Sequence, residues 1–380
     1  MKPAPDIQTD DLTAVTTLLT NRIAANCHTF GTQFPNYGTG YTYVLNDNVN
    51  WLAAFWPGIL WQCATQDSPN AAVCQNTAER LLASFRRRLA KQVHITHDLG
   101  FLYNLSARAQ WQVTGNEDAR DLALLAADLL QQRYRLPGRY IQAWGPVGDA
   151  DEGGRIIADT MMNLPLLFWA SEQTGDPRFH EAAYRHAQAS QAHLMRPDGS
   201  SYHTFFFDQE TGAPDHAETH QGFGDESLWA RGQAWMIYGF AIAAQWCADA
   251  SFLTTAVQAS ERFLAELPPD NVPYWDLRLP DEEPHLRDSS AGAVAACGLL
   301  RLAELTGEAR YRAQAQTLVD ALLARCLERD PAGQGLLKHG ALHIPKGWAP
   351  DDYLIFGDYF FLEALLTLAG TAVDFWGPTV

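Results

Sequence analysis

The chain has 380 residues, with 27 lysines and arginines against 44 aspartates and glutamates, and thus a formal charge of −17. With 47% hydrophobic and 19% charged residues it has the composition of a globular protein with a large core, which excludes intrinsic disorder. The anionic balance argues against nucleic acid and anionic membranes as partners, because both would be repelled.

The N-terminal sequence and the cysteines bear on location. The start, MKPAPDIQTDDLTAV, has neither a basic region nor an apolar stretch, so no secretory signal is expected. The six cysteines form no CxxC pair and no metal-ligand spacing, which is typical of reduced thiols in a cytoplasmic protein. The apolar run from Tyr359 to Val373 contains Glu363 and is interpreted as a buried terminal helix rather than a membrane span.

A turn followed by an amphipathic helix recurs along the chain, beginning at Ser68, Thr114, Thr174, Cys247 and Thr306. An apolar helix precedes each copy, and residues 10–64 are interpreted as a further pair, so about twelve helices are expected. Gly115, Gly175 and Gly307 can take the positive φ that ends one helix before the next begins. Such pairs cannot bury their apolar faces alone, so they must stack on their neighbours.

Small residues favour one of two arrangements of the stacked pairs, an open solenoid or a closed ring. The helix that contains Ala291–Ala296 is rich in alanine and glycine, which favours the tight packing of a closed ring. We therefore predict an all-α fold, an (α/α)6 toroid of six helical hairpins, formed by residues 1–380 as one domain. Strand signals are few, and the best of them, at residues 203–212, lies in a connection between helices.

Long connections between the helices are rich in Trp, His, Asp, Gly and Pro. In a ring of hairpins they would gather at one mouth, and long loops on a rigid scaffold are where function usually resides. The segments concerned are residues 142–159, 196–231, 271–288 and 335–358.

Two aspartates occupy equivalent places in successive repeats. Asp98 lies in THDLGF and Asp159 in IIADTMMN, each at an expected helix start, so either could be a simple helix N-cap. Apolar neighbours would raise the pKa of Asp159, as a general acid near neutral pH requires. Because the repeat would bring both carboxylates to the same mouth, the pair suggests glycosidic or related acid–base chemistry.

A third motif, DESLWARGQAW, ends at Trp235. Arg231 and Trp235 are four residues apart on one helix face, where an arginine can pair with a carboxylate and an indole can stack on a sugar ring. The same two residues could instead be a structural arginine–acid pair beside a core tryptophan. Trp51, Trp144 and His203 lie in other long connections. No HExxH, GxSxG, P-loop or strand-associated GxGxxG motif is found.

Six motifs together resemble a known family. They are THDLGFLY (96–103), IIADTMMNLPLLFWAS (156–171), ARGQAWMIYGF (230–240), PYWDL (273–277), RDSSAGAVAACGLL (287–300) and FGDYFFLEALL (356–366). In this order and spacing they resemble the unsaturated glucuronyl hydrolases, glycoside hydrolase family 88, over residues 51–368. The resemblance implies a six-hairpin toroid that acts, without metal or organic cofactor, on lyase-generated oligosaccharides ending in a 4,5-unsaturated uronic acid.

The resemblance also implies roles for particular residues. Asp159 would be the general acid/base that hydrates the C4=C5 vinyl ether, and Asp98 the second essential carboxylate. Arg231 would offset the uronate charge, and Trp51 and Trp235 would shape the walls around the sugar. Substrate contacts are implied for Trp51, His97, Trp144, His203, Gln221, Arg231 and Trp235. Sulfate-preferring members carry serines and a lysine before the last helix; this chain offers Lys346 without a nearby serine, so tolerance of a sulfated aglycone stays open.

Other functions remain to be weighed. The family 105 unsaturated rhamnogalacturonyl hydrolases share the toroid and the chemistry, although HDLGF and ADTMMN favour family 88. Sugar epimerases on (α/α) toroids would use histidine pairs as acid and base. A non-catalytic helical-repeat protein would need no carboxylate such as Asp159 among apolar residues beside Asp98. Because the implied substrate is itself an anion, the excess acid must lie mostly on the outer helices, and an acidic mouth would contradict the family 88 interpretation.

Overall fold

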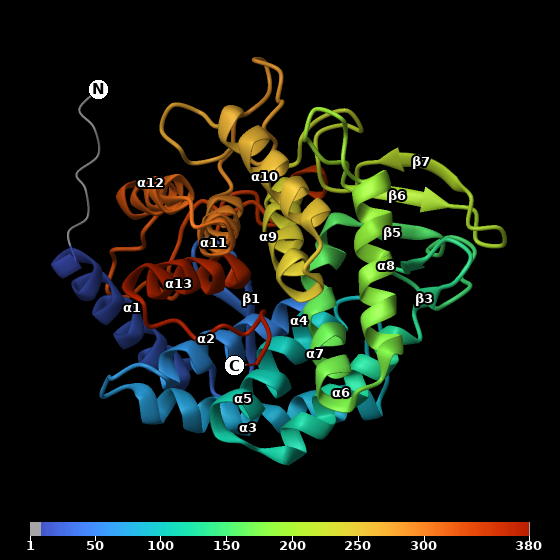
Figure 1. Cartoon of the computed structure of the whole chain (residues 1–380). Coiled ribbons are helices and arrows are strands. Elements are labelled where there is room, and N and C mark those ends of the chain that lie inside the picture. The colour runs from blue at the N-terminus through green and yellow to red at the C-terminus, as the bar shows by residue number, and fades with distance from the viewer. Residues whose placement is uncertain (1–8, 380) are drawn as a thin grey trace.

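Helices that are buried on almost all sides alternate along the chain with helices that expose one face. The computed structural model describes residues 9–379, and the buried helices form an inner ring surrounded by the others (Figure 1). The outer helices are α1 (Thr9–Phe30), α3 (Ala71–Ala90), α6 (Glu117–Gln131), α8 (Pro177–His193), α10 (Ala250–Ala265) and α12 (Ala309–Arg325).

The inner ring of the described chain has six helical segments. One is composite, because α4 (Leu99–Tyr103) continues through a π turn (Asn104–Arg108) into α5 (Ala109–Thr114). Helices α13 and α2 come from opposite ends of the chain, yet they pack side by side and close the ring (Figure 1). The predicted (α/α)6 toroid is confirmed. The other inner helices are α2 (Phe55–Ala64), α7 (Leu164–Thr174), α9 (Ala230–Cys247), α11 (Ser289–Thr306) and α13 (Ile355–Ala369).

The pattern of apolar residues decides which layer a helix joins. Helix α6 has apolar residues at helical spacing on one face, and it buries that face only. Helix α11 is rich in small and apolar residues on every side and is buried over most of its length. At Gly298, a Cβ would lie 2.8 Å from a methyl carbon of Ile237. Glycine at this position therefore allows α11 to pack closely on α9.

Left-handed glycines separate several inner helices from the outer helices that follow them. Gly115, Gly175 and Gly307 have φ values of 70°, 72° and 71° and end α5, α7 and α11, as predicted. The next helix begins immediately: the side chain of Asn116 accepts from the backbone of α6, and that of Asp176 accepts from the backbone of α8. The short turns in this layer place inner and outer helices antiparallel.

Short strands occur in the long connections. The pairs are β1 (Phe34–Gly38) with β2 (Tyr43–Asn46) and β3 (Tyr134–Arg135) with β4 (Tyr140–Ile141). A three-stranded antiparallel sheet joins β5 (Arg155–Ile157), β6 (Thr204–Phe207) and β7 (Pro214–Glu218). Strand β6 lies within the segment predicted to be extended. Because Ile157 pairs with Thr204, the sheet brings the segment before α7 against the segment before α9.

The apolar run near the C-terminus is divided between α13 and the segment that follows it. Glu363 lies within α13, is buried, and accepts hydrogen bonds from Tyr238 and Trp376, so the prediction of a buried terminal helix is confirmed. Within residues 9–379, no helix is long and apolar enough to cross a membrane.

Candidate active site

A cavity of about 400 Å³ opens where the inner helices begin. Three of the long connections that were predicted to gather at one mouth contribute to its wall, through Trp144, His220 and His343 respectively. The fourth, residues 271–288, supports the wall from behind. The carboxylate of its Asp276 accepts hydrogen bonds from the backbone of residues 223 and 228 in the neighbouring connection. Both predicted carboxylates line the cavity.

Asp98 occupies the N-cap position of α4, but its side chain makes no capping hydrogen bond. Instead, its carboxylate accepts from Oγ1 of Thr96 (3.0 Å) and lies 3.4 Å from Nε2 of His97. The side chain keeps 15% of its surface exposed to the cavity. The simple N-cap interpretation is therefore excluded, and the carboxylate is available for chemistry.

His97 is 1% exposed and has a defined tautomer. The backbone N–H of Phe101 donates to Oδ1 of Asn163 (2.7 Å), which turns Nδ2 of Asn163 toward Nδ1 of His97 (3.4 Å). Oγ1 of Thr160 is 2.8 Å from the same ring nitrogen. Nδ1 therefore accepts, and the proton is on Nε2, which faces Asp98. Burial lowers the pKa of His97, so the ring that lies beside Asp98 is neutral.

Asp159 lies in the 3₁₀ turn Ala158–Asn163 that leads into α7, and it is 8% exposed. Its Oδ2 makes no hydrogen bond to another protein group. Burial raises the pKa of this carboxyl to about 7, a rise that nearby Arg231 opposes and nearby Asp98 reinforces. Near neutral pH, Asp159 can therefore both give and take a proton, whereas a structural N-cap aspartate would be held ionised by its hydrogen bonds.

His203 faces Asp159 from beneath the cavity surface. Its Nδ1 accepts from the backbone N–H groups of His220 and Gln221, both at 3.0 Å, so its proton is on Nε2. That nitrogen is 4.0 Å from Oδ2 of Asp159 and makes no other hydrogen bond to the protein. Burial places the pKa of His203 well below its usual value, so the ring is neutral. The arrangement offers an acid–base carboxyl with a fixed donor beside it.

A family model described as Glycosyl Hydrolase Family 88 matches residues 27–353. The chain belongs to this family. It is 47% identical to the unsaturated glucuronyl hydrolase of Bacillus sp. (strain GL1), over 93% of this chain and 95% of that protein. It is 37% identical to the unsaturated chondroitin disaccharide hydrolase of Streptococcus pyogenes serotype M1, over 97% and 93% of the two chains.

Solved structures agree with the toroid. The crystal structure of the Bacillus sp. GL1 unsaturated glucuronyl hydrolase has a TM-score of 0.92 at 46% identity, over 97% of this chain and 99% of that one. The enzyme from Streptococcus agalactiae has a TM-score of 0.93 at 33% identity, over 98% and 95%. An aspartate-to-asparagine mutant of the latter enzyme was solved with dGlcA-GalNAc6S, with a TM-score of 0.85 at 31% identity over 98% and 95% of the chains.

Three more of the predicted substrate contacts line the cavity of this family 88 enzyme: Trp51, Trp144 and Gln221. Trp51 stacks on Phe356, with 5.2 Å between ring centroids, and this fixes one aromatic wall. Trp144 lies under the guanidinium of Arg155, 5.1 Å from its ring centroid. Gln221 donates from Nε2 to the backbone oxygen of residue 342 (2.9 Å), so the connections before α9 and α13 are linked at the wall.

Arg231 and Trp235 are placed differently from the expectation. Arg231 is 1% exposed; its guanidinium forms an ion pair with the buried Asp288 and donates to the backbone oxygens of Ala341 and Leu342. Its charge is thus balanced inside the protein, and it positions the cavity loop rather than presenting a free cation. Trp235 is fully buried, packs on other aromatic rings, and does not line the cavity. Both residues act from behind the wall.

The connection before α13 also provides His343 and Trp348, which sequence reasoning did not select, and Lys346, which it considered only for a sulfated aglycone. His343, Lys346 and Trp348 all line the cavity, and Lys346 places its ammonium 4.9 Å from the centroid of the Trp348 ring and 3.4 Å from Nε2 of His220. Trp348 is 52% exposed, so it lies at the rim, whereas Asp159 lies at the floor. The one sequence signal for His343 and Trp348 was the enrichment of such residue types in a long connection. In the described part of the chain, no cluster of three or more His, Cys, Asp or Glu side chains could hold a metal ion.

Proposed function

We propose that this family 88 enzyme removes the 4,5-unsaturated uronic acid from the non-reducing end of lyase-generated oligosaccharides. The observation that carries the proposal is Asp159, a buried carboxyl with a pKa of about 7 and an unpaired oxygen, which shares its cavity with Asp98. The family membership and the names of the similar enzymes support this substrate class.

The chemistry assigned to Asp159 is hydration of a vinyl ether. Protonated Asp159 gives its proton to C4, and positive charge develops on C5 and the ring oxygen. Water then adds to C5 and returns a proton to Asp159, which leaves a hemiketal at C5. The hemiketal opens to a ketone at C5, the resulting hemiacetal at C1 collapses to an aldehyde, and the aglycone sugar departs. One water is consumed, and Asp159 ends protonated as it began.

Asp98 is assigned the second role. Its carboxylate would lie across the cavity from the developing cation and stabilise it electrostatically in a site shielded from bulk water. Nε2 of His97 lies 3.4 Å from one oxygen of this carboxylate, and the hydroxyl of Thr96 donates to the other. Such support from neighbouring side chains lowers the reorganisation needed when charge develops.

The depth at which the lining residues lie indicates how the substrate is oriented. Asp159 and His97 at the floor are nearly buried, and Trp348 at the rim is half exposed. A terminal sugar must therefore enter first, and the aglycone must point toward the opening. The walls formed by Trp51 and Trp144 suit the apolar faces of a sugar ring, which fits an enzyme that removes terminal residues.

The test uses the conjugated enoate of the substrate, whose ultraviolet absorbance is lost on hydration. Purified protein is mixed with an unsaturated uronyl disaccharide, and the expected result is loss of absorbance with release of the aglycone sugar. Asp159→Asn should lose activity by at least about 100-fold while it stays folded. Full activity in this variant would refute the role of Asp159, and inactivity of the wild type on glucuronyl disaccharides but turnover of rhamnogalacturonyl ones would refute the substrate class.

The thiols support a proposal about cellular location. All six cysteines are unpaired, and unpaired buried cysteines are typical of proteins from reducing compartments. We infer a cytoplasmic enzyme that receives small oligosaccharides after a lyase has cut the polymer.

A further inference from the structure

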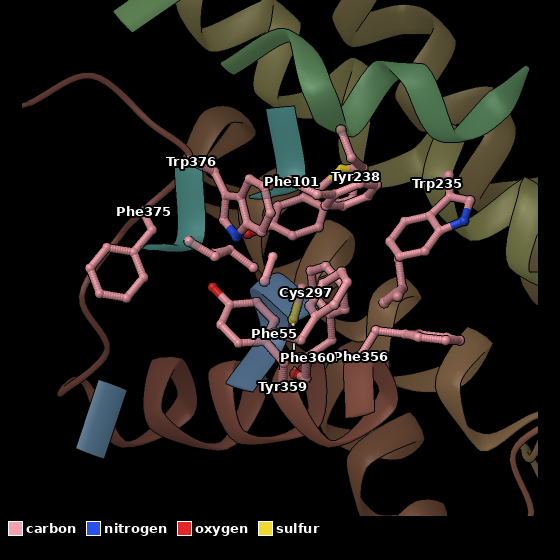
Figure 2. Packing of buried hydrophobic residues seen from close by; sticks show 14 of the residues in the cluster. Phe55, Phe101, Trp235, Tyr238, Cys297, Phe356, Tyr359, Phe360, Phe375 and Trp376 are labelled. Carbon is pink, nitrogen blue, oxygen red and sulfur yellow. Dashed lines mark hydrogen bonds between the residues drawn. The ribbon is translucent and has the colours of Figure 1, made fainter. Parts of the chain in front are cut away.

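The chain that follows α13 has neither helix nor strand, yet its aromatic residues are completely buried. Phe375 and Trp376 are 0% exposed. Figure 2 shows Trp376 among rings supplied by the inner helices, including Phe101 and Phe360. The segment of residues 371–379 thus runs beneath the toroid, at the end of the ring opposite the active-site cavity.

Five consecutive carbonyl groups of this segment, those of residues 373–377, each accept a hydrogen bond from a side chain of the inner ring. The donor atoms lie on α2, the π turn, α5 and α9. In the order of the carbonyls, the donors are Gln62 (2.8 Å), Gln112 (2.9 Å), Asn104 (2.6 Å), Trp246 (2.9 Å) and Arg108. Polar side chains at the base of the ring are therefore committed to holding a peptide without helix or strand.

Side chains of the segment reach the remaining inner helices. Asp374 pairs with Arg301 of α11 (2.8 Å), and Nε1 of Trp376 donates to the carboxylate of Glu363 in α13 (2.8 Å). The backbone N–H of Thr379 lies 3.5 Å from the carboxylate of Glu172 in α7. One segment of nine residues, 371–379, is thus bonded to every segment of the described inner ring.

An aromatic column connects this segment with the active site. Trp376 stacks on Phe360 (centroids 5.9 Å apart, planes 16° apart), and Phe360 contacts Trp235 (5.3 Å). Phe101 contacts both tryptophans, at 6.1 Å and 5.5 Å. The indole of Trp235 lies close enough to Asp159 to act on its protonation. Figure 2 shows Trp376, Phe101, Phe360 and Trp235 within one cluster of buried side chains.

Solvent approaches the column from below. A hollow of about 240 Å³ is lined by Tyr238, Glu363, Arg301 and Asp374, so water reaches the outer side of the segment. Trp376 is the ring of the stack that belongs to the segment itself, and it packs on Phe360.

We propose that the C-terminal segment is the plug of the toroid and that Trp376 is a positioning residue, which keeps water from entering beneath Asp159. This rests on the proposed role of Asp159 as the acid. Because burial is the main cause of the raised pKa of Asp159, water admitted from below should lower that pKa. The alkaline limb of the kcat profile, where the acid loses its proton, should then move to lower pH.

A graded series tests the plug. Trp376→Ala and Trp376→Leu remove the ring, whereas Trp376→Phe keeps a six-membered ring and loses the bond to Glu363 with the smaller part of the indole. Trp246→Phe is the matched control, because it removes one hydrogen bond to the same segment without entering the column. We expect the alkaline limb to fall by about one pH unit or more in the Ala variant, by less in Leu, and to stay within about 0.3 units in both Phe variants.

A second readout needs no substrate. We compare the free energy of unfolding of each plug variant with that of the same variant carrying Asp159→Asn, from pH 4 to pH 9. The pH dependence of the difference reports the pKa of Asp159 by linkage. It separates failure of the plug from failure of the proposed function. If Trp376→Ala does not fold, the pKa of Asp159 in Trp376→Leu tests the proposal. An unchanged pKa of Asp159 in a folded Ala or Leu variant, or an equal shift in Trp246→Phe, would overturn the proposal.

Discussion

Removing the charge of Asp159 should stabilise the protein while it abolishes the activity, and the gain should depend on pH. The carboxyl titrates near 3.8 when unfolded but near 7 in the folded enzyme, because burial disfavours the ionised form. Between these values the unfolded chain has lost its proton and the folded chain has kept it. Stability therefore falls as pH rises through this window and is constant above it. Asparagine does not titrate and escapes this loss.

The size of the effect follows from the two pKa values. A rise from 3.8 to about 7 is roughly three units, and each unit corresponds to about 1.36 kcal/mol. Asp159→Asn should thus be more stable than the wild type by about 4 kcal/mol at pH 8 and about equal to it at pH 4. Asparagine keeps the size of the side chain and one oxygen that can accept from the groups near the carboxyl, Trp235 and the backbone of residue 159.

Urea unfolding of both proteins at several values between pH 4 and pH 8 measures this difference. Other buried acids, such as Asp358, contribute equally to both proteins and cancel. Asp151→Asn, an exposed carboxylate in the same connection, controls for the loss of one charge from an anionic protein. A stability difference that is the same at pH 4 and pH 8, or a variant that is less stable at pH 8, would refute the assignment of a buried, protonated Asp159.

Three other substitutions have distinct expected outcomes. A Cβ at Gly100 would lie 2.3 Å from Cα of Asn163, so Gly100→Ala should push apart the segments that carry the two aspartates. We expect the free energy of unfolding to fall by about 1–3 kcal/mol and kcat to fall at least tenfold. Arg231→Gln leaves Asp288 buried without its ion pair and should lower the free energy of unfolding by about 3–5 kcal/mol. A variant that keeps its stability and only raises KM would instead make Arg231 a direct substrate contact. Lys346→Ala should keep kcat and stability but raise KM, by more at low ionic strength, and an unchanged KM would exclude its charge from binding.

The toroid could be predicted because its repeat depends on short-range features of the sequence. One-sided and all-round apolar patterns alternate along the chain, glycines end several of the inner helices, and each of these features depends on neighbours within a few residues. The π turn at Asn104–Arg108 could not be predicted in this way. Its stability comes from bonds between Asn104, Arg108 and the carbonyls of Phe375 and Gly377, some 270 residues later.

The site was predictable in part for the same reason. Asp98 and Asp159 share a place in the repeat, and the structure brings both into one cavity. Which face of an inner helix meets the cavity is decided by packing between helices. For that reason sequence could not show that Arg231 is turned toward Asp288. Nor could it select Trp348, whose position depends on the backbone pairing of residues 343 and 348.

The charge of the cavity explains how a protein with a formal charge of −17 can bind an anion. Burial lowers the pKa values of His97, His220 and His343, so these rings are neutral. Protonated Asp159 is neutral as well. The negative charge of Asp98 is then opposed by Lys346 at the rim, and the cavity contributes almost nothing to the net charge. The excess acid lies outside it, where salt screens charges beyond about 8 Å. Local neutrality and directed N–H donors, rather than the overall field, must therefore govern the binding of a uronate.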